Sequence, residues 1–244
     1  MASNYKLILF LGLFIISITS SSASTSTSTT STTSTPTPTK LSSFNVVTFG
    51  AKADGKTDST GAFLKAWTAA CNSINPPRLY VPRGTYLIEK LELRGPCKST
   101  SPMTVQIDGT LVAPPDYRQL ANSGNWIVFI KISGLSVTGG TIDARGATFW
   151  ACNKNCPSGA RSITFNSVTN LAVSGLTSMN SQATHMVISG CNNVVVSKVS
   201  ITAPGQSPNT DGIHVQSSTG VTIEDSAIKT GDDCVSIGPG TKNS

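Results

Sequence analysis

Acidic side chains, histidines and aromatic rings are all scarce in this chain of 244 residues. It contains twelve Asp and Glu residues against eighteen Lys and Arg, two histidines, and 6% aromatic residues. The low aromatic content favours a core of aliphatic side chains. With two imidazoles and no second cysteine pair at zinc spacing, a zinc site is disfavoured.

Long apolar segments are absent after the amino terminus, which disfavours a membrane-spanning helix of roughly 20 residues. At the amino terminus, Lys6 precedes an apolar run at 7–18 and small residues at 20–23, the pattern of a secretory signal peptide. We therefore predict a signal peptide at 1–23 and a secreted, extracellular protein with no membrane association after its removal. Residues 24–43 are almost entirely Ser and Thr and predict a disordered linker, followed by one domain at 44–244.

The net charge of +6 is compatible with an acidic partner. Secretion argues against nucleic acid, and the lack of a basic amphipathic helix or a Lys/Arg cluster argues against a membrane surface. A polyanionic cell-wall sugar remains. The alternative is that the charge serves solubility alone.

Six cysteines in an exported chain predict disulfides. Cys152 and Cys156 are close enough in sequence to form a local loop, and this pairing is favoured over a metal hook. The remaining pairings stay open.

An internal repeat predicts the architecture. Its landmarks are Phe165, Ile188, Val215 and Ile237, at intervals of 23, 27 and 22 residues. Two more apolar positions recur six and eight residues later: Leu171, Val194 and Val221, then Val173, Val196 and Ile223. This period suits a coil of short strands and is too short for paired helices. Alternating strands with Ser, Thr, Gly and Asn at the corners predict an all-β, single-stranded parallel β-helix.

One helix is predicted near the start of the domain. Ala62, Phe63, Ala66, Trp67 and Ala70 form an apolar stripe at helical spacing. Thr57 and Asp58 are the candidate N-caps. We expect this helix to cap the N-terminal end of the coil, with its aromatic residues in the core.

Three carboxylates follow the phase of the repeat. Asp211 precedes Val215 by four residues, and Asp233 precedes Ile237 by four. The two aspartates are therefore predicted to lie at equivalent positions on successive coils, about 4.8 Å apart, with Asp232 beside them. Glycoside hydrolysis requires carboxylates arranged about one bond. A calcium-binding turn is the alternative.

These carboxylates are expected to face a surface groove. Strict alternation would turn Asp211 inward, and an unpaired buried carboxylate costs several kcal/mol. The chain must bend between acid and strand, and Gly212 and Gly231 are predicted to supply the backbone freedom.

The acidic strings carry a family resemblance. The string NTDGIHV at 209–215, followed by GDDCVSIG at 231–238, resembles the paired signature of the polygalacturonases, glycoside hydrolase family 28. The string VTFGAKADGKTD at 47–58 belongs to the same pattern, and the plant members look most similar. The resemblance spans nearly all of the predicted domain.

The resemblance implies a right-handed, pectin-lyase-like β-helix that hydrolyses α-1,4 links between galacturonic acid units of pectin with inversion. It implies neither a metal nor an organic cofactor. It implies that Asp232 is the general acid and that Asp211 and Asp233 activate the attacking water. An inverting site needs its acid and base carboxyls roughly 6.5 to 9.5 Å apart, which neighbouring coils allow if the side chains splay. The expected partner is pectic polysaccharide in the cell wall, and the expected state is a monomer.

Three further residues are predicted to bind substrate: Asn209, His214 and His185. His185 has the phase of Gly212 on the preceding coil, with a hydrogen-bonded structural role as the alternative. His214 alternates with buried neighbours, so it should lie on the outer face beside the groove, in contact with sugar or simply with solvent. Asn209 could orient Asp211 or join an Asn stack.

Two segments that the family pattern places after these strings, Gly-His-Gly and Arg-Ile-Lys, do not occur before Ser244. We therefore expect the domain to be incomplete at its C-terminal end, Cys234 to lack its partner, and uronate binding to be weakened. A catalytically inactive wall-polysaccharide binder with the same fold is the alternative function. A calcium-dependent pectin lyase is a further alternative, disfavoured because Asp232 and Asp233 match the hydrolase string.

Overall fold

The computed structural model describes residues 41–152 and 154–243. The predicted signal peptide and most of the predicted linker lie outside these residues. The first strand begins at Ser42. This strand begins two residues before the predicted domain boundary at residue 44.

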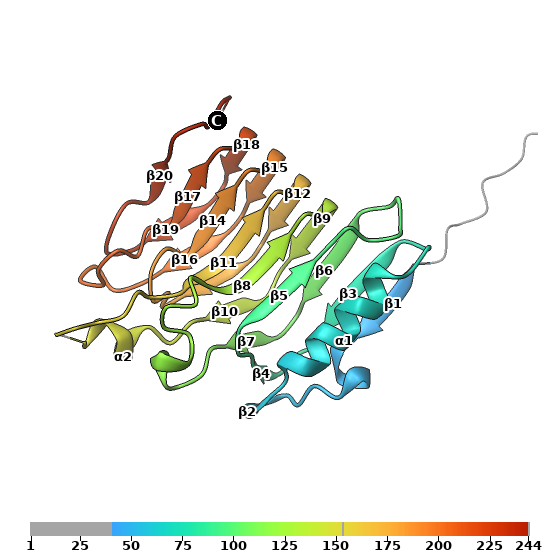
Figure 1. Ribbon diagram of the computed structural model, residues 1–244, viewed down its shortest axis with the longest axis horizontal. Helices are drawn as coiled ribbons and strands as arrows, with labels where there is room; N and C mark the ends of the chain where they lie inside the picture. The colour runs from blue at the N-terminus through green and yellow to red at the C-terminus, as the bar shows by residue number, and fades with distance from the viewer. Residues whose placement is uncertain (1–40, 153, 244) are drawn as a thin grey trace, which may run out of the picture. The chain divides into compact units, whose positions relative to one another are not determined.

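The described residues form an all-β, right-handed parallel β-helix, as predicted (Figure 1). From β3 (Pro77–Val81) onward, each coil contributes one strand to each of three sheets in turn, and every pair of neighbouring strands is parallel. In the first coil, α1 (Thr60–Cys71) follows β1 (Ser42–Asn45) and β2 (Asp54–Asp58) in place of a strand of the third sheet. Parallel crossovers of this kind are right-handed in nearly all proteins. Stacked coils bury one continuous core between them.

The strands of the three sheets are as follows. The first sheet consists of β1 (Ser42–Asn45), β3 (Pro77–Val81), β6 (Met103–Ile107), β9 (Ser133–Thr138), β12 (Thr169–Ser174), β15 (Asn192–Ser197) and β18 (Thr219–Glu224). The second consists of β2 (Asp54–Asp58), β4 (Thr85–Leu87), β7 (Thr110–Val112), β10 (Thr141–Asp143), β13 (Thr177–Met179), β16 (Ser200–Thr202) and β19 (Ala227–Lys229). The third consists of β5 (Leu91–Arg94), β8 (Asn125–Ile130), β11 (Arg161–Asn166), β14 (Met186–Ser189), β17 (Ile213–Gln216) and β20 (Val235–Ile237).

The register predicted from the repeat is confirmed. In the third sheet Phe165 pairs with Ile188, Ile188 with Val215, and Val215 with Ile237. The first two landmarks are completely buried. The Phe165 ring stacks on Phe129 of the preceding coil, with 5.4 Å between ring centroids. The apolar positions that recur every 22 to 27 residues are therefore the rungs of the core.

Polar residues turn the corners, also as predicted. Asn170 and Asn193 occupy equivalent positions near the start of β12 and β15, both with positive φ. The Asn193 side-chain amide donates to Asn170 Oδ1 at 2.8 Å. Short polar side chains tolerate this left-handed backbone better than branched ones.

The predicted helix is present as α1 (Thr60–Cys71), at the N-terminal end of the coil stack (Figure 1). Phe63 and Trp67 are buried in the core, as expected. The N-cap prediction is wrong, because the capping position is Ser59. Asp58 nonetheless accepts a hydrogen bond from the first helical N–H, that of Thr60, at 2.9 Å. The helix thus begins two residues after Asp58, and not directly after it.

Three short helical segments complete the described chain: η1 (Val46–Phe49), η2 (Tyr117–Gln119) and α2 (Ala147–Trp150). None of the helices in the described ranges has the length and apolarity needed to span a bilayer.

Two disulfides are formed. Cys152 bonds to Cys156, which confirms the predicted local loop, and Cys71 bonds to Cys97. The second bond links the end of α1 to the segment between β5 and β6. Within the described residues, Cys191 and Cys234 are unpaired, and Cys234 is exposed.

Candidate active site

The two acidic strings lie side by side, each just before a strand of the third sheet. Asp211 precedes β17, and Asp232 and Asp233 precede β20. The Gly212 N–H donates to the carbonyl of Asp233 at 2.8 Å, and the Gly231 N–H donates to Thr210 Oγ1 at 3.0 Å. These two bonds tie the strings together across successive coils. The predicted alignment of Asp211 with Asp233 is therefore confirmed at the level of the backbone.

Thr210 anchors this junction from the interior. It is completely buried, and its hydroxyl lies 2.7 Å from that of Ser207, which is also buried. Ser207 in turn donates to the carbonyl of Pro204 at 2.6 Å. A buried polar chain of this kind stabilises one backbone arrangement because each member would lose its partner in another. The residue before Asp211 is thereby fixed.

Asp211 is half-buried and is held by a hydroxyl of the next coil. The Ser236 Oγ–H donates to Asp211 Oδ2 at 2.7 Å. His214 Nδ1 lies 2.8 Å from the same Ser236 oxygen. Because Ser236 gives its single proton to Asp211, the hydrogen between His214 and Ser236 must belong to Nδ1. One oxygen of Asp211 is thus fixed by a His–Ser pair from two coils.

Asp232 and Asp233 are exposed beside this group. The Asp233 N–H donates to Asp232 Oδ1 at 2.9 Å, so the Asp232 carboxylate folds back over its own turn. Thr230 Oγ1 donates to the Asp232 carbonyl at 3.2 Å. The turn therefore presents both carboxylates to solvent.

The glycines of the two strings act differently from the prediction. Neither Gly212 nor Gly231 has a positive φ. A Cβ at Gly212 would come within 2.4 Å of Ile228 Cγ2, and a Cβ at Gly231 would come within 2.1 Å of the Ser207 carbonyl oxygen. Close approach between coils, rather than backbone freedom, requires glycine here. The left-handed residue is Asn209, with φ 55.

His185 does not face the groove, and its predicted contact with substrate is wrong. The side chain is 0% exposed, and its Nδ1 lies 2.9 Å from Ser178 Oγ in the interior. Burial lowers the pKa of His185 to about 4. His185 is therefore a buried structural histidine, which was the alternative to a contact with substrate. Gly212 aligns with His185 on the next coil, and a Cβ on Gly212 would point at Ile228. Side chains at these equivalent positions therefore point inward.

A groove of ≈ 380 Å³ lies beside Asp211. Asn209 and Asp211 line one end of it, and residues that precede β8, β11 and β14 line the rest. The lining includes Gly124, Phe149, Pro157, Ser158, Gly159, Arg161, Gln182, Ala183 and Thr184. The groove therefore crosses several coils at the edge where strands of the third sheet begin.

His214 lies on the outer face of β17 and is half-buried. Its Nε2 is 3.4 Å from Gln216 Oε1. Neither this side chain nor those of Asp232 and Asp233 line the groove itself. The structure thus brings Asp211 and Asn209 to the groove, and sets the other aspartates and His214 on the adjoining coil edge.

Metal binding finds no support in the described ranges. Across residues 41–152 and 154–243, no group of three or more His, Cys, Asp or Glu side chains is arranged to hold a metal ion. The Cys152–Cys156 pair, considered as a metal hook, is a disulfide.

Ser236 is the residue of this site that the sequence analysis missed. It pairs with His214 in the register that joins β17 to β20. The signal was present, because Ser236 precedes the landmark Ile237 by one residue, as His214 precedes Val215. A serine inside a Ser-rich chain does not stand out until its neighbours in space are known.

The chain was compared with known proteins. Residues 71–244 match the family model described as Glycosyl hydrolases family 28. A polygalacturonase of Prunus persica is 53% identical over 205 residues, which make up 82% of this chain and 52% of that protein. An exopolygalacturonase of Zea mays is 42% identical over 205 residues, or 82% of this chain and 50% of that protein.

Solved structures agree in fold. An endo-xylogalacturonan hydrolase from Aspergillus tubingensis has a TM-score of 0.69 at 25% identity, covering 80% of this chain and 53% of that chain. An exopolygalacturonase from Thermotoga maritima has a TM-score of 0.69 at 21% identity, covering 80% of this chain and 54% of that chain. The chain spans about half the length of these curated relatives. On the match over residues 71–244 and the 53% identity to a plant relative, the chain belongs to glycosyl hydrolases family 28.

Proposed function

We propose that this chain hydrolyses α-1,4-galacturonosyl links of pectin by an inverting mechanism. The observation that carries the proposal is the pairing of the two acidic strings on successive coils: Asp211 lines one end of the groove, and Asp232 and Asp233 lie on the adjoining coil edge. Membership of a glycosyl hydrolase family and the names of the peach and maize relatives support the reaction class and the substrate.

Asp232 is proposed as the general acid. Its carboxylate is exposed on the turn before β20, where a proton can pass to the oxygen of the leaving sugar. Position supports this role: the Asp232 carboxylate accepts the Asp233 N–H within its own turn and stays exposed to solvent.

Asp211 and Asp233 are proposed to activate the attacking water. The Ser236 hydroxyl donates a hydrogen bond to Asp211 Oδ2, which leaves Oδ1 free to accept a proton from water. Asp233 lies one coil further along and offers a second acceptor to the same water. An inverting site needs room for that water between its acid and base carboxyls. Asp211 and Asp232 come from two adjacent coils, so the two carboxyl groups are held by separate turns of the chain.

The substrate is proposed to be a polyuronide that lies across the coils. A linear chain of sugars fits a groove that crosses the starts of β8, β11, β14 and β17. Asn209 lines this groove, and His214 sits at its edge, so both are proposed to contact sugar. The protein is further proposed to be secreted to the cell wall and to act there as a monomer, in keeping with its leader-like amino terminus and net charge of +6.

Release of reducing ends from polygalacturonate tests the proposal. The chain is expected to release them, and Asp232→Asn is expected to lower the rate by about 100-fold to 10,000-fold, the usual contribution of a general acid. Binding of polygalacturonate should be retained in the variant. If the unmodified chain binds polygalacturonate but releases nothing, the binding function replaces the hydrolase. Unsaturated products that absorb in the ultraviolet would indicate a lyase instead.

A further inference from the structure

The groove holds a cationic side chain that the proposed mechanism does not use. Among the described residues that line it, Arg161 is the cation and Asp211 is the carboxylate. Arg161 is exposed and forms no ion pair within the described residues. A free guanidinium in a groove is a ready partner for a carboxylate, which it can bind through two parallel N–H bonds.

Arg161 stands in the same row as the aspartates. The Ser162 N–H donates to the Thr184 carbonyl at 3.1 Å, and the His185 N–H donates to the Asp211 carbonyl at 2.8 Å. These bonds align Arg161 with Thr184 and Thr184 with Asp211, one residue per coil. Since neighbouring strands lie about 4.8 Å apart, the backbone of Arg161 is about 10 Å from that of Asp211 along the groove. The cation is therefore displaced from the reacting carboxylates along the path of a linear substrate.

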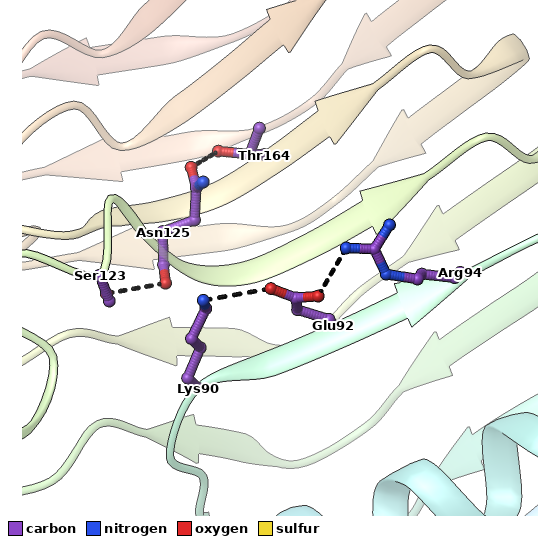
Figure 2. Close-up of polar contacts among 6 residues, drawn as sticks. All are labelled: Lys90, Glu92, Arg94, Ser123, Asn125 and Thr164. Atoms are coloured by element: carbon purple, nitrogen blue, oxygen red, sulfur yellow. Dashed lines mark hydrogen bonds and ion pairs between the residues drawn. The ribbon is translucent and has the colours of Figure 1, made fainter.

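Two cations at β5, two coils before Arg161, are already paired. Figure 2 shows Glu92 of β5 between Lys90 and Arg94, at 3.1 and 2.8 Å. The Asn125 side chain, which is next to Arg161 in the register, is turned to Thr164 and accepts its hydroxyl at 2.6 Å (Figure 2). Both strand neighbours of Arg161 in its row, Asn125 and Thr184, are uncharged. Neither of these adjacent residues is an anion that could pair with its guanidinium.

The walls beside Arg161 suit a sugar ring. Gly124, Gly159 and Ala183 line the groove with small side chains. A Cβ on Gly159 would come within 2.9 Å of the Phe149 ring, so the aromatic ring stands directly over that backbone. Ligand sites commonly combine an apolar wall with a few polar groups that fix orientation. A uronate unit could place its ring against Phe149 and its carboxylate on Arg161.

We propose that Arg161 binds the carboxylate of a galacturonate unit located two coils from Asp211, and so determines the preference of the groove for uronides over neutral or esterified sugars. This inference rests on the proposed polygalacturonate substrate and names the residue that recognises its charge. Arg161 is a substrate-specificity residue and takes no part in proton transfer.

The test measures binding, separately from hydrolysis. In an Asp232→Asn background that slows turnover, calorimetry would compare Arg161→Gln, Arg161→Lys and Lys198→Gln for a galacturonate oligomer and for its methyl ester. Lys198 is an exposed cation at the corner between β15 and β16 and serves as the matched control for loss of charge. We expect Arg161→Gln to bind the free acid about tenfold more weakly, equivalent to about 1.4 kcal/mol. Arg161→Lys should recover part of the affinity, and Lys198→Gln should bind as the parent does.

The methyl ester separates charge recognition from a change in groove shape. Arg161→Gln and its parent should bind the ester equally well. Equal affinity of the two proteins for the free acid, or an equal loss for acid and ester, would overturn the assignment of Arg161 while leaving the proposed hydrolysis intact. If the parent binds no galacturonate oligomer at all, both the inference and the proposed substrate are overturned.

Discussion

At the scale of residues, the site depends on hydroxyl groups as much as on carboxylates. Ser236 and His214 together fix one oxygen of Asp211, and the buried Thr210 fixes the backbone on which Asp211 stands. Side chains that act through another residue contribute to catalysis by keeping the reacting groups in position, and a displacement of 1 Å can cost on the order of 100-fold in rate. Ser236 is therefore a positioning residue.

Replacing Ser236 tests this role. Ser236→Ala should lower kcat on polygalacturonate by up to about 100-fold, because Asp211 loses the hydroxyl that orients it. KM should change much less, since Ser236 does not line the groove. Ser236→Thr retains a hydroxyl and should recover most of the rate. An unchanged kcat for the alanine variant would show that Asp211 needs no such support.

His185 makes the stability of the domain dependent on pH. Its pKa is about 4 in the folded protein, below the ordinary value of 6.5, because burial disfavours the charged ring. Below pH 6.5 the unfolded chain takes up a proton that the folded chain does not. The free energy of unfolding therefore falls as the pH falls from about 6.5 to 4, by about 3 kcal/mol for this group.

Denaturant unfolding at several pH values would measure this effect. The variant His185→Gln keeps a polar side chain near Ser178 but does not titrate, so its free energy of unfolding should fall less steeply between pH 7 and pH 4. Exposed carboxylates contribute equally to the pH dependence of unfolding in both proteins, so their contribution cancels in the comparison. Identical slopes for the two proteins would contradict the buried, neutral state of His185.

Much of the site was readable from the sequence at this scale. The four-residue offset from Val215 and Ile237 placed Asp211 and Asp233 on neighbouring coils, and the hydrogen bonds between their strings agree. The same offset from Phe165 leads to Arg161, which becomes interesting only once the groove is known. His185 was misjudged because the repeat predicts which residues align between coils but not whether their side chains point inward or outward. That direction depends on contacts such as the one between Gly212 and Ile228.

At the scale of elements, neighbouring coils approach one another closely at the acidic strings. Gly212 has no room for a methyl group because Ile228 and the Cys234 carbonyl occupy the space. Glycine here is a consequence of packing between coils and not of turn geometry. The strings can lie side by side because their glycines allow it.

A pair of alanine variants tests this packing. Gly212→Ala should destabilise the domain by about 1 to 3 kcal/mol, the usual cost of overpacking, and should lower the hydrolytic rate by displacing Asp211. Gly205→Ala is the control, because its Cβ would meet nothing within 4 Å and its φ is not positive. Thermal unfolding of both variants would settle the comparison. Equal stability of the two variants would show that the coils can separate at no cost.

Strands were easier to predict than caps at this scale. The repeat predicted which residues form the core, because apolar residues must recur wherever a coil stacks on the next. The N-cap of α1 was missed by one residue, because it is Ser59 and not Asp58. Ends of elements depend on a few local hydrogen bonds, such as that from the Thr60 N–H to Asp58, and a Ser/Thr-rich sequence offers several equivalent candidates.

At the scale of the whole domain, the coil stack runs from the α1 cap to β18, β19 and β20, which are the last strands of their sheets. Ile237 on β20 is 61% exposed, although its equivalents Val215 and Ile188 are buried. The candidate site lies where β17 meets this last coil. The proposed chemistry thus depends on Asp211 and Asp233, which only the stacking of two coils brings side by side.

The configuration of the first product tests that account most directly. Proton NMR would follow a galacturonate oligomer with the unmodified chain and with Asp232→Asn. The account predicts that the new reducing end first appears as the β anomer, because an α link is cleaved with inversion, and that Asp232→Asn forms it at least about 100-fold more slowly. An α anomer as the first product, equal rates for the two proteins, or no product from the unmodified chain would contradict it.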